Sequence, residues 1–246
     1  MSGILEVRGL AKSFGRKPVF ADLTLTLEKG KVHGLLGRNG EGKTTLIRII
    51  TGVIPADRGE VICDGRPVRF GDAAAKQGIG YIPEDPFFFG GMRIGELLDF
   101  NAAFYPRWES RKAADYLEMF GLDRRAKVRT LSRGLKLKLG FIVALSARPE
   151  LLILDDPTSG IDVPTRRDLL RDVIRELADA GTTVLFATHM VHELERIVER
   201  LFILHGGRLV LDEDYEAVRE RMAARPPSDR EAGPVSLEDI FRSFVS

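Results

Sequence analysis

Residues 37–44, GRNGEGKT, constrain this chain more than any other stretch. They fit the pattern G-x-x-x-x-G-K-[S/T], in which backbone N–H groups surround phosphates, the lysine reaches the β- and γ-phosphates, and the hydroxyl holds Mg²⁺. An apolar run over residues 32–36 precedes the pattern and predicts a buried strand, and apolar residues at helical spacing follow it. This order of strand, glycine loop and helix places free N–H groups and the positive end of a helix around an anion. The sequence therefore predicts a nucleotide phosphate site centred on Lys43 and Thr44.

The remaining apolar patterns predict an α/β fold. A block over residues 94–147 has helical spacing and no strand signals, so we expect a helical subdomain, at about residues 85–147, inserted into a mostly parallel sheet. An N-terminal antiparallel β subdomain precedes it, and the whole domain covers residues 1–224. A polar linker and a short amphipathic helix follow over residues 225–246. Further strands are predicted over residues 59–63, 80–82, 151–154, 183–187, 201–204 and 208–211, and further helices over 163–180 and 191–198.

Composition narrows the classes of partner. The 246 residues include 37 Lys and Arg against 36 Asp and Glu, a formal charge of +1, so no electrostatic argument favours a nucleic acid and none is expected. The single cysteine, Cys63, indicates a reducing compartment. The N-terminus lacks the apolar core of a signal peptide, and no apolar run approaches the roughly 18 residues of a membrane span. We expect a cytoplasmic chain that does not span a membrane by itself.

Three further motifs follow the phosphate loop in a specific order. Residues 131–135 read LSRGL, the apolar strand over 151–155 ends in Asp155 and continues as DPTSGID, and Thr188 and His189 close the next predicted strand. In enzymes with this loop, a carboxylate at such a strand end holds Mg²⁺. Each motif is weak alone. Together they resemble the ATP-binding subunits of ABC transporters over about residues 3–212, and thus a P-loop NTPase fold.

The resemblance implies a role for each matching residue, with ATP and Mg²⁺ as cofactors. Phe14 would stack on adenine, Asp156 takes the position of the catalytic base, His189 that of the γ-phosphate switch, and Asp162 that of the acid in the inter-subunit loop. Glu84 stands where a glutamine usually senses Mg²⁺ and the γ-phosphate, so Thr44, Asp155 and Glu84 are the implied metal-site residues. The implied phosphate-binding residues are Gly37, Arg38, Asn39, Gly40, Glu41, Gly42, Lys43, Thr44 and Thr45.

The resemblance also implies partners. Ser132 is a good N-cap, so the free N–H groups after it form a second anion site. In the family, two subunits pair head to tail and hold ATP between one phosphate loop and the other chain's signature, here Ser132, Arg133 and Gly134. A second ATPase subunit, identical or different, is therefore implied. An integral membrane permease would recruit the pair to the cytoplasmic face of the membrane. The run FYPRW, the signature and the LEDIF tail resemble exporter-type subunits.

Four positions depart from the family pattern. Arg133 and Leu135 interrupt the usual LSGGQ signature, Glu41 adds negative charge to the phosphate loop, and Glu84 replaces glutamine. Asp156 replaces the glutamate that polarises the attacking water. Because aspartate is about 1.5 Å shorter, and a misplacement of ~1 Å can cost ~10²-fold in rate, we expect slow hydrolysis with intact ATP binding.

Several interpretations remain open at this stage. The chain could be a soluble ABC ATPase, or a regulatory subunit that binds nucleotide with little hydrolysis. Phe14 could be a packed turn residue rather than an adenine contact, and residues 87–89, FFF, could be core or a patch that receives a membrane partner. His33, His192 and His205 are interpreted as structural.

Overall fold

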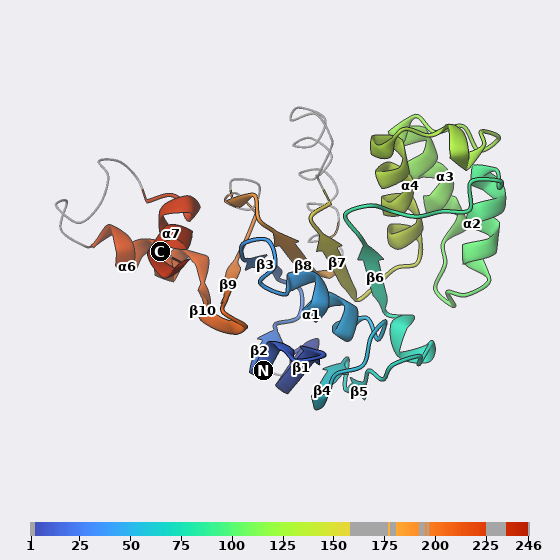
Figure 1. The fold of residues 1–246 in the computed structure, drawn as a ribbon. Coiled ribbons are helices and arrows are strands. Elements are labelled where there is room, and N and C mark those ends of the chain that lie inside the picture. The colour runs from blue at the N-terminus through green and yellow to red at the C-terminus, as the bar shows by residue number, and fades with distance from the viewer. Residues whose placement is uncertain are drawn as a thin grey trace.

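The structure, a computed structural model, describes residues 3–157, 177, 181–191, 195, 197–224 and 235–245. A large sheet occupies the centre, a smaller sheet lies below it, and a helical block stands to one side (Figure 1). The expected fold class is confirmed, including the antiparallel N-terminal sheet and the inserted helices. Asp162 and nearly all of the predicted helix over residues 163–180 lie outside the described part of the chain.

The large sheet has the strand order β10-β9-β3-β8-β7-β6. All neighbouring pairs are parallel except β9 and β10, which are antiparallel. Leu36 pairs with Thr188 and Asp155 with Ala187, so three motif-bearing strands end at the same edge. Ligands of open α/β sheets bind outside this carboxyl edge. The strands are β3 (Val32–Leu36), β6 (Ile79–Ile82), β7 (Leu151–Asp155), β8 (Thr183–Thr188), β9 (Arg200–His205) and β10 (Arg208–Asp214).

The smaller sheet is antiparallel, with the order β2-β1-β4-β5. Its strands are β1 (Leu5–Phe14), β2 (Lys17–Leu27), β4 (Arg58–Cys63) and β5 (Arg66–Pro67). Helix α1 (Lys43–Ile50) shares one apolar cluster with this sheet and with one face of the large sheet. Asp64 and Gly65 form a tight turn after β4, both with positive φ. The small sheet thus supports the phosphate loop and its helix from one side.

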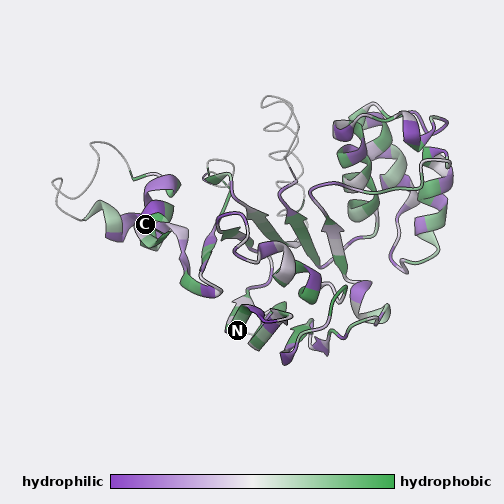
Figure 2. Cartoon of the chain, in the orientation of Figure 1, coloured by the Kyte–Doolittle hydropathy of each residue, from purple (hydrophilic) through white to green (hydrophobic). Residues whose placement is uncertain are grey.

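The helical block packs against the other face of the large sheet in a second apolar cluster. It contains α2 (Ile94–Ala102), α3 (Ser110–Phe120) and α4 (Arg133–Ser146), with the short 3₁₀ turn η2 (Val128–Thr130) between α3 and α4. A second 3₁₀ turn, η1 (Ala74–Lys76), precedes β6. Figure 2 shows hydrophobic residues concentrated on the central strands of the large sheet, and β3, β7 and β8 are buried on both faces. Continuous apolar strands are what such a doubly covered sheet requires.

The C-terminal part contains one helix that the sequence analysis did not predict. Helix α6 (Tyr215–Ala223) follows β10 and was not predicted, because only two of its residues, Tyr215 and Val218, are buried and the rest give no apolar stripe. The predicted helix α7 (Leu237–Val245) is confirmed, and its Leu237 and Ile240 are fully buried in the second cluster. No helix among the residues that the structure describes is long and apolar enough to cross a membrane.

Candidate nucleotide-binding site

The phosphate loop joins β3 to α1 and depends on its glycines. Gly40 and Gly42 have φ values of 88° and 104°, a region that favours glycine. A Cβ atom on Gly42 would lie 2.7 Å from a methyl of Val19, and one on Gly37 would lie 2.9 Å from the Leu204 carbonyl oxygen. The loop can therefore take this course only without side chains at these positions.

Lys43 lies inside the loop. Its Nζ donates hydrogen bonds to the carbonyl oxygens of Gly37, at 2.8 Å, and Arg38, at 3.4 Å. Burial lowers the pKa of the ammonium, whereas the charges of Asp156 and Asp155 raise it. Both of these carbonyl acceptors are neutral backbone oxygens, so the positive charge of Nζ is available for an anion at the loop.

Thr44 and Asp155 form the expected oxygen pair. The Thr44 hydroxyl donates to Asp155 Oδ1 at 3.3 Å, and the Tyr81 hydroxyl lies 3.5 Å from Oδ2. Burial raises the pKa of the Asp155 carboxyl, with smaller opposing effects from Thr44 and Lys43. Burial also raises the pKa of Tyr81 to about 12, so it stays a neutral donor. Sequence reasoning missed Tyr81, although a polar residue in the strand next to β7 was a usable signal.

This oxygen pair fits Mg²⁺. Mg²⁺ prefers oxygen ligands and is usually bound by one or two protein groups together with substrate phosphates. The Thr44 hydroxyl and the buried Asp155 carboxylate supply that set next to the phosphate loop. The described residues contain no larger cluster of His, Cys, Asp and Glu that could hold a metal ion alone.

Asp156 and His189 contact each other at the edge of the sheet. Asp156 Oδ1 accepts a hydrogen bond from the His189 backbone N–H at 3.1 Å and lies 2.9 Å from the ring Nδ1. The Asp156 N–H donates to the Ala187 carbonyl oxygen at 2.8 Å, and the residue has a φ of 43°. The side chain is largely buried while His189 is exposed. The two residues that the resemblance assigns to chemistry are thus brought together.

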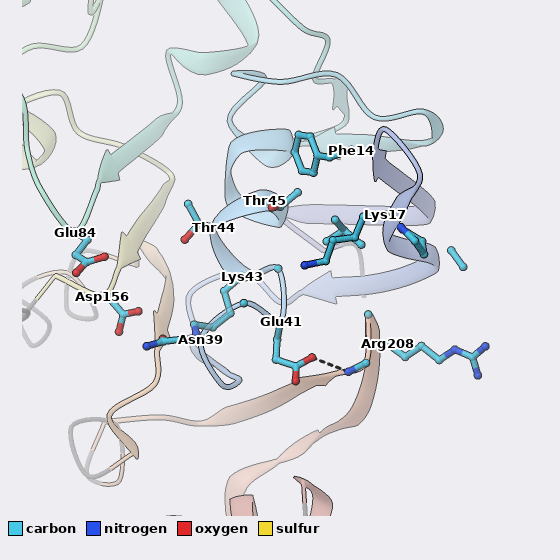
Figure 3. A pocket seen from close by; sticks show the side chains of 17 residues that line it. Phe14, Lys17, Asn39, Glu41, Lys43, Thr44, Thr45, Glu84, Asp156 and Arg208 are labelled. Atoms are coloured by element: carbon cyan, nitrogen blue, oxygen red, sulfur yellow. Dashed lines mark hydrogen bonds between the residues drawn. The ribbon is translucent and has the colours of Figure 1, made fainter.

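Lys43, Thr44 and Asp156 line a cavity of about 600 Å³ (Figure 3), whereas Asp155 and His189 are not among its lining residues. Phe14 stands at its edge with 54% of its surface exposed, and Lys12 Nζ lies 5.4 Å from the ring centroid, so the ring is not packed in the interior. Glu84 also lines the cavity. Sequence reasoning missed seven further lining residues: Lys17, Pro18, Val19, Ala21, Gly206, Gly207 and Arg208.

The signature residues lie elsewhere in the same chain. Ser132 caps α4 as predicted, with its hydroxyl accepting from the Leu135 N–H at 3.3 Å. Neither Ser132 nor Gly134 lines the cavity. Arg133 reaches Glu84, donating to its carbonyl oxygen at 3.3 Å and lying 3.7 Å from its carboxylate. Arg133 therefore contacts a residue that lines the cavity.

Comparison with known proteins agrees with this geometry. The family model described as "ABC transporter" matches residues 20–159. YtrB of Bacillus subtilis, named an ABC transporter ATP-binding protein, is 35% identical over 217 residues, covering 88% of this chain and 74% of its own. The linearmycin resistance ATP-binding protein LnrL of the same organism is 35% identical over 212 residues, covering 84% and 68%. The chain belongs to the ABC transporter family, as an ATP-binding subunit.

Solved structures give the same result. One, described as the ATP-binding subunit of an ABC transporter, superposes with a TM-score of 0.87 at 28% identity and covers 98% of this chain and 99% of its own. The structure of cbiO1 from Clostridium perfringens superposes with a TM-score of 0.73 at 22% identity, covering 93% and 98%, which supports the fold.

Proposed function

We propose that this subunit binds MgATP in the cavity, hydrolyses it as one half of a pair of subunits, and thereby drives a separate membrane permease. The observation that carries the proposal is the meeting of Lys43, Thr44, Asp155, Asp156 and His189 at the carboxyl edge of one sheet. Each has the chemistry that ATP hydrolysis needs, and the five come from three separate parts of the chain.

The residues divide the chemistry between them. Lys43 and the loop N–H groups would hold the β- and γ-phosphates, while Thr44 and Asp155 would hold Mg²⁺, which when bound would supply positive charge next to the phosphates. Among the described residues only Oδ1 of Asp156 is engaged, by His189, so Oδ2 is left to accept a proton from the attacking water. The water oxygen bonds to the γ-phosphorus, and the bond to the β-phosphate oxygen breaks to release ADP and phosphate.

The second subunit follows from the position of the signature. Ser132 and the free N–H groups at the start of α4 form an anion site that does not face this chain's own cavity. A second copy or a related subunit could place its own signature over the phosphate loop, so that two chains share two nucleotides.

Asp156 favours one further candidate function, a regulatory subunit with little hydrolysis, because its carboxylate is shorter than the usual glutamate.

A row of exposed aromatic residues supports docking to a permease. Phe87, Phe89, Phe100 and Phe104 are exposed, and their rings follow one another at centroid distances of 6.5, 6.5 and 5.0 Å. Phe88 was expected to belong to the same docking patch or to the core; it is partly buried and packs against the second apolar cluster. Exposed apolar patches mark interaction sites. We propose that this row receives the permease on the cytoplasmic face of the membrane and, following the exporter-like motifs, that the complex exports its substrate.

Phe87 provides the test, because it is 87% exposed and its replacement leaves the core intact. Phe87→Asp should reduce the membrane-bound fraction of the protein in its native cells about tenfold, as a charge enters an apolar contact, without changing ATP affinity. Phe70→Asp is the matched control, since Phe70 is 65% exposed and lies outside the row. Equal membrane binding by wild type and Phe87→Asp, or equal losses in both variants, would rule out this docking surface.

A further inference from the structure

The carboxylate of Glu41 turns away from the phosphate-binding face of its loop. Oε2 accepts a hydrogen bond from the Gly206 N–H at 2.7 Å, and Oε1 lies 3.0 Å from Nδ1 of His205. In Figure 3 the side chain points away from Thr44 and Asp156 and is joined to the turn before Arg208. The added negative charge is therefore held on the outer side of the loop, where two donors compensate it.

The turn that Glu41 contacts joins β9 to β10, and at Gly207 it lies close against β2. Gly206 and Gly207 have φ values of 57° and 72°. A Cβ atom on Gly207 would lie 2.2 Å from the Val19 carbonyl oxygen of β2. The turn thus touches the antiparallel sheet on one side and the phosphate loop on the other. Gly206, Gly207 and Arg208 line the same cavity as the loop.

We propose that Glu41 is a positioning residue for nucleotide binding, which ties the phosphate loop to the β9–β10 turn and makes that turn a wall of the ATP cavity. Glu41 acts through Gly206 and His205, and it does not touch the phosphates. The inference rests on the proposed ATP site. It also explains how the loop carries an acidic residue without repelling the triphosphate.

The proposal predicts that Glu41→Ala changes ATP affinity in the opposite direction to a simple charge effect. If the carboxylate acted only as a nearby negative charge, Glu41→Ala would tighten ATP binding. If it positions the loop and the turn, Glu41→Ala should weaken ATP binding about tenfold, the loss expected when a charge-assisted hydrogen bond is removed. Glu41→Gln keeps an acceptor for the Gly206 N–H and should bind ATP within about twofold of wild type.

Titration of the full chain with ATP, at fixed Mg²⁺, tests the proposal with four variants. His205→Ala removes one of the two partners and should weaken binding by about threefold, and the Glu41→Ala and His205→Ala effects should be non-additive. Glu213→Ala is the charge-matched control, because Glu213 lies on β10, pairs with Arg221 and does not line the cavity. It should bind as wild type does.

The rate of amide hydrogen exchange at Gly206 distinguishes the loss of this contact from a general loss of stability. Glu41→Ala should speed exchange of the Gly206 N–H selectively, with thermal unfolding close to that of wild type. If Glu41→Ala does not fold, the comparison of Glu41→Gln with His205→Ala decides instead. Unchanged or tighter ATP binding by Glu41→Ala, or a loss in Glu41→Gln as large as in Glu41→Ala, would overturn the proposal. Failure of the wild type itself to bind ATP would instead contradict the proposed function.

Discussion

Lys43→Ala is expected to weaken ATP binding about 100-fold or more, because it removes the buried cation that would pair with the β- and γ-phosphates. The fold should survive. Burial already lowers the pKa of Lys43, so its charged form is disfavoured inside the loop, and the side chain donates hydrogen bonds to two loop carbonyl oxygens. Equilibrium titration with a fluorescent ATP analogue, alongside thermal unfolding, measures both effects.

Lys29→Ala is the control for the loss of one positive charge, since Lys29 is exposed and does not line the ATP cavity. It should bind ATP as wild type does. A Lys43→Ala protein that is folded and retains wild-type affinity would show that the phosphate loop does not hold the nucleotide.

Asp156 should control the rate of hydrolysis rather than the binding of ATP. Asp156→Asn removes the carboxylate that we propose as the acceptor of the water proton, and it should lower the ATPase rate about 100-fold or more, the range for loss of a general base. Asparagine also suits the positive φ of 43°. Asp156→Glu extends the carboxylate by about 1.5 Å and should raise the rate about tenfold, or about 1.4 kcal/mol off the barrier.

The structure shows two requirements that the Asp156→Glu variant must meet before its rate can increase. A longer side chain must keep or replace the contacts that Asp156 makes with His189, and glutamate fits the positive φ less well than aspartate. Thermal unfolding of the variant and its ATP affinity therefore accompany the rate measurement. A stable Asp156→Glu protein with unchanged affinity and a flat or lower rate would show that the site is built around the shorter acid.

The sequence was sufficient to predict the features that local patterns encode. The phosphate loop lies between a strand and a helix as expected, Ser132 caps α4, and the ends of β7 and β8 bring Asp155, Asp156 and His189 to one edge. These predictions succeeded because a motif and its neighbouring apolar run determine both the element and its position in a parallel sheet.

Contacts between distant segments could not be predicted in the same way. Glu41 and His205 are 164 residues apart, and no local pattern relates them. The difference between partly buried Phe88 and exposed Phe87 depends on the direction of each side chain in a loop. Helix α6 buries only two of its residues, Tyr215 and Val218, and therefore shows no apolar stripe in the sequence. The role of Asp162 remains a prediction, and this residue lies outside the described part of the chain. The roles of the other site residues also remain predictions.

The central claim is that two chains share each ATP, and mixing two inactive variants tests it most directly. Lys43→Ala removes the phosphate contact of one chain, and Ser132→Arg blocks the signature that it would offer to its partner. Each variant alone should be nearly inactive as an ATPase. In an equimolar mixture, random pairing gives half of the dimers one intact site, so the account predicts recovery of roughly a quarter of the wild-type rate. No recovery, in a mixture shown by native mass spectrometry to contain mixed dimers, would contradict it.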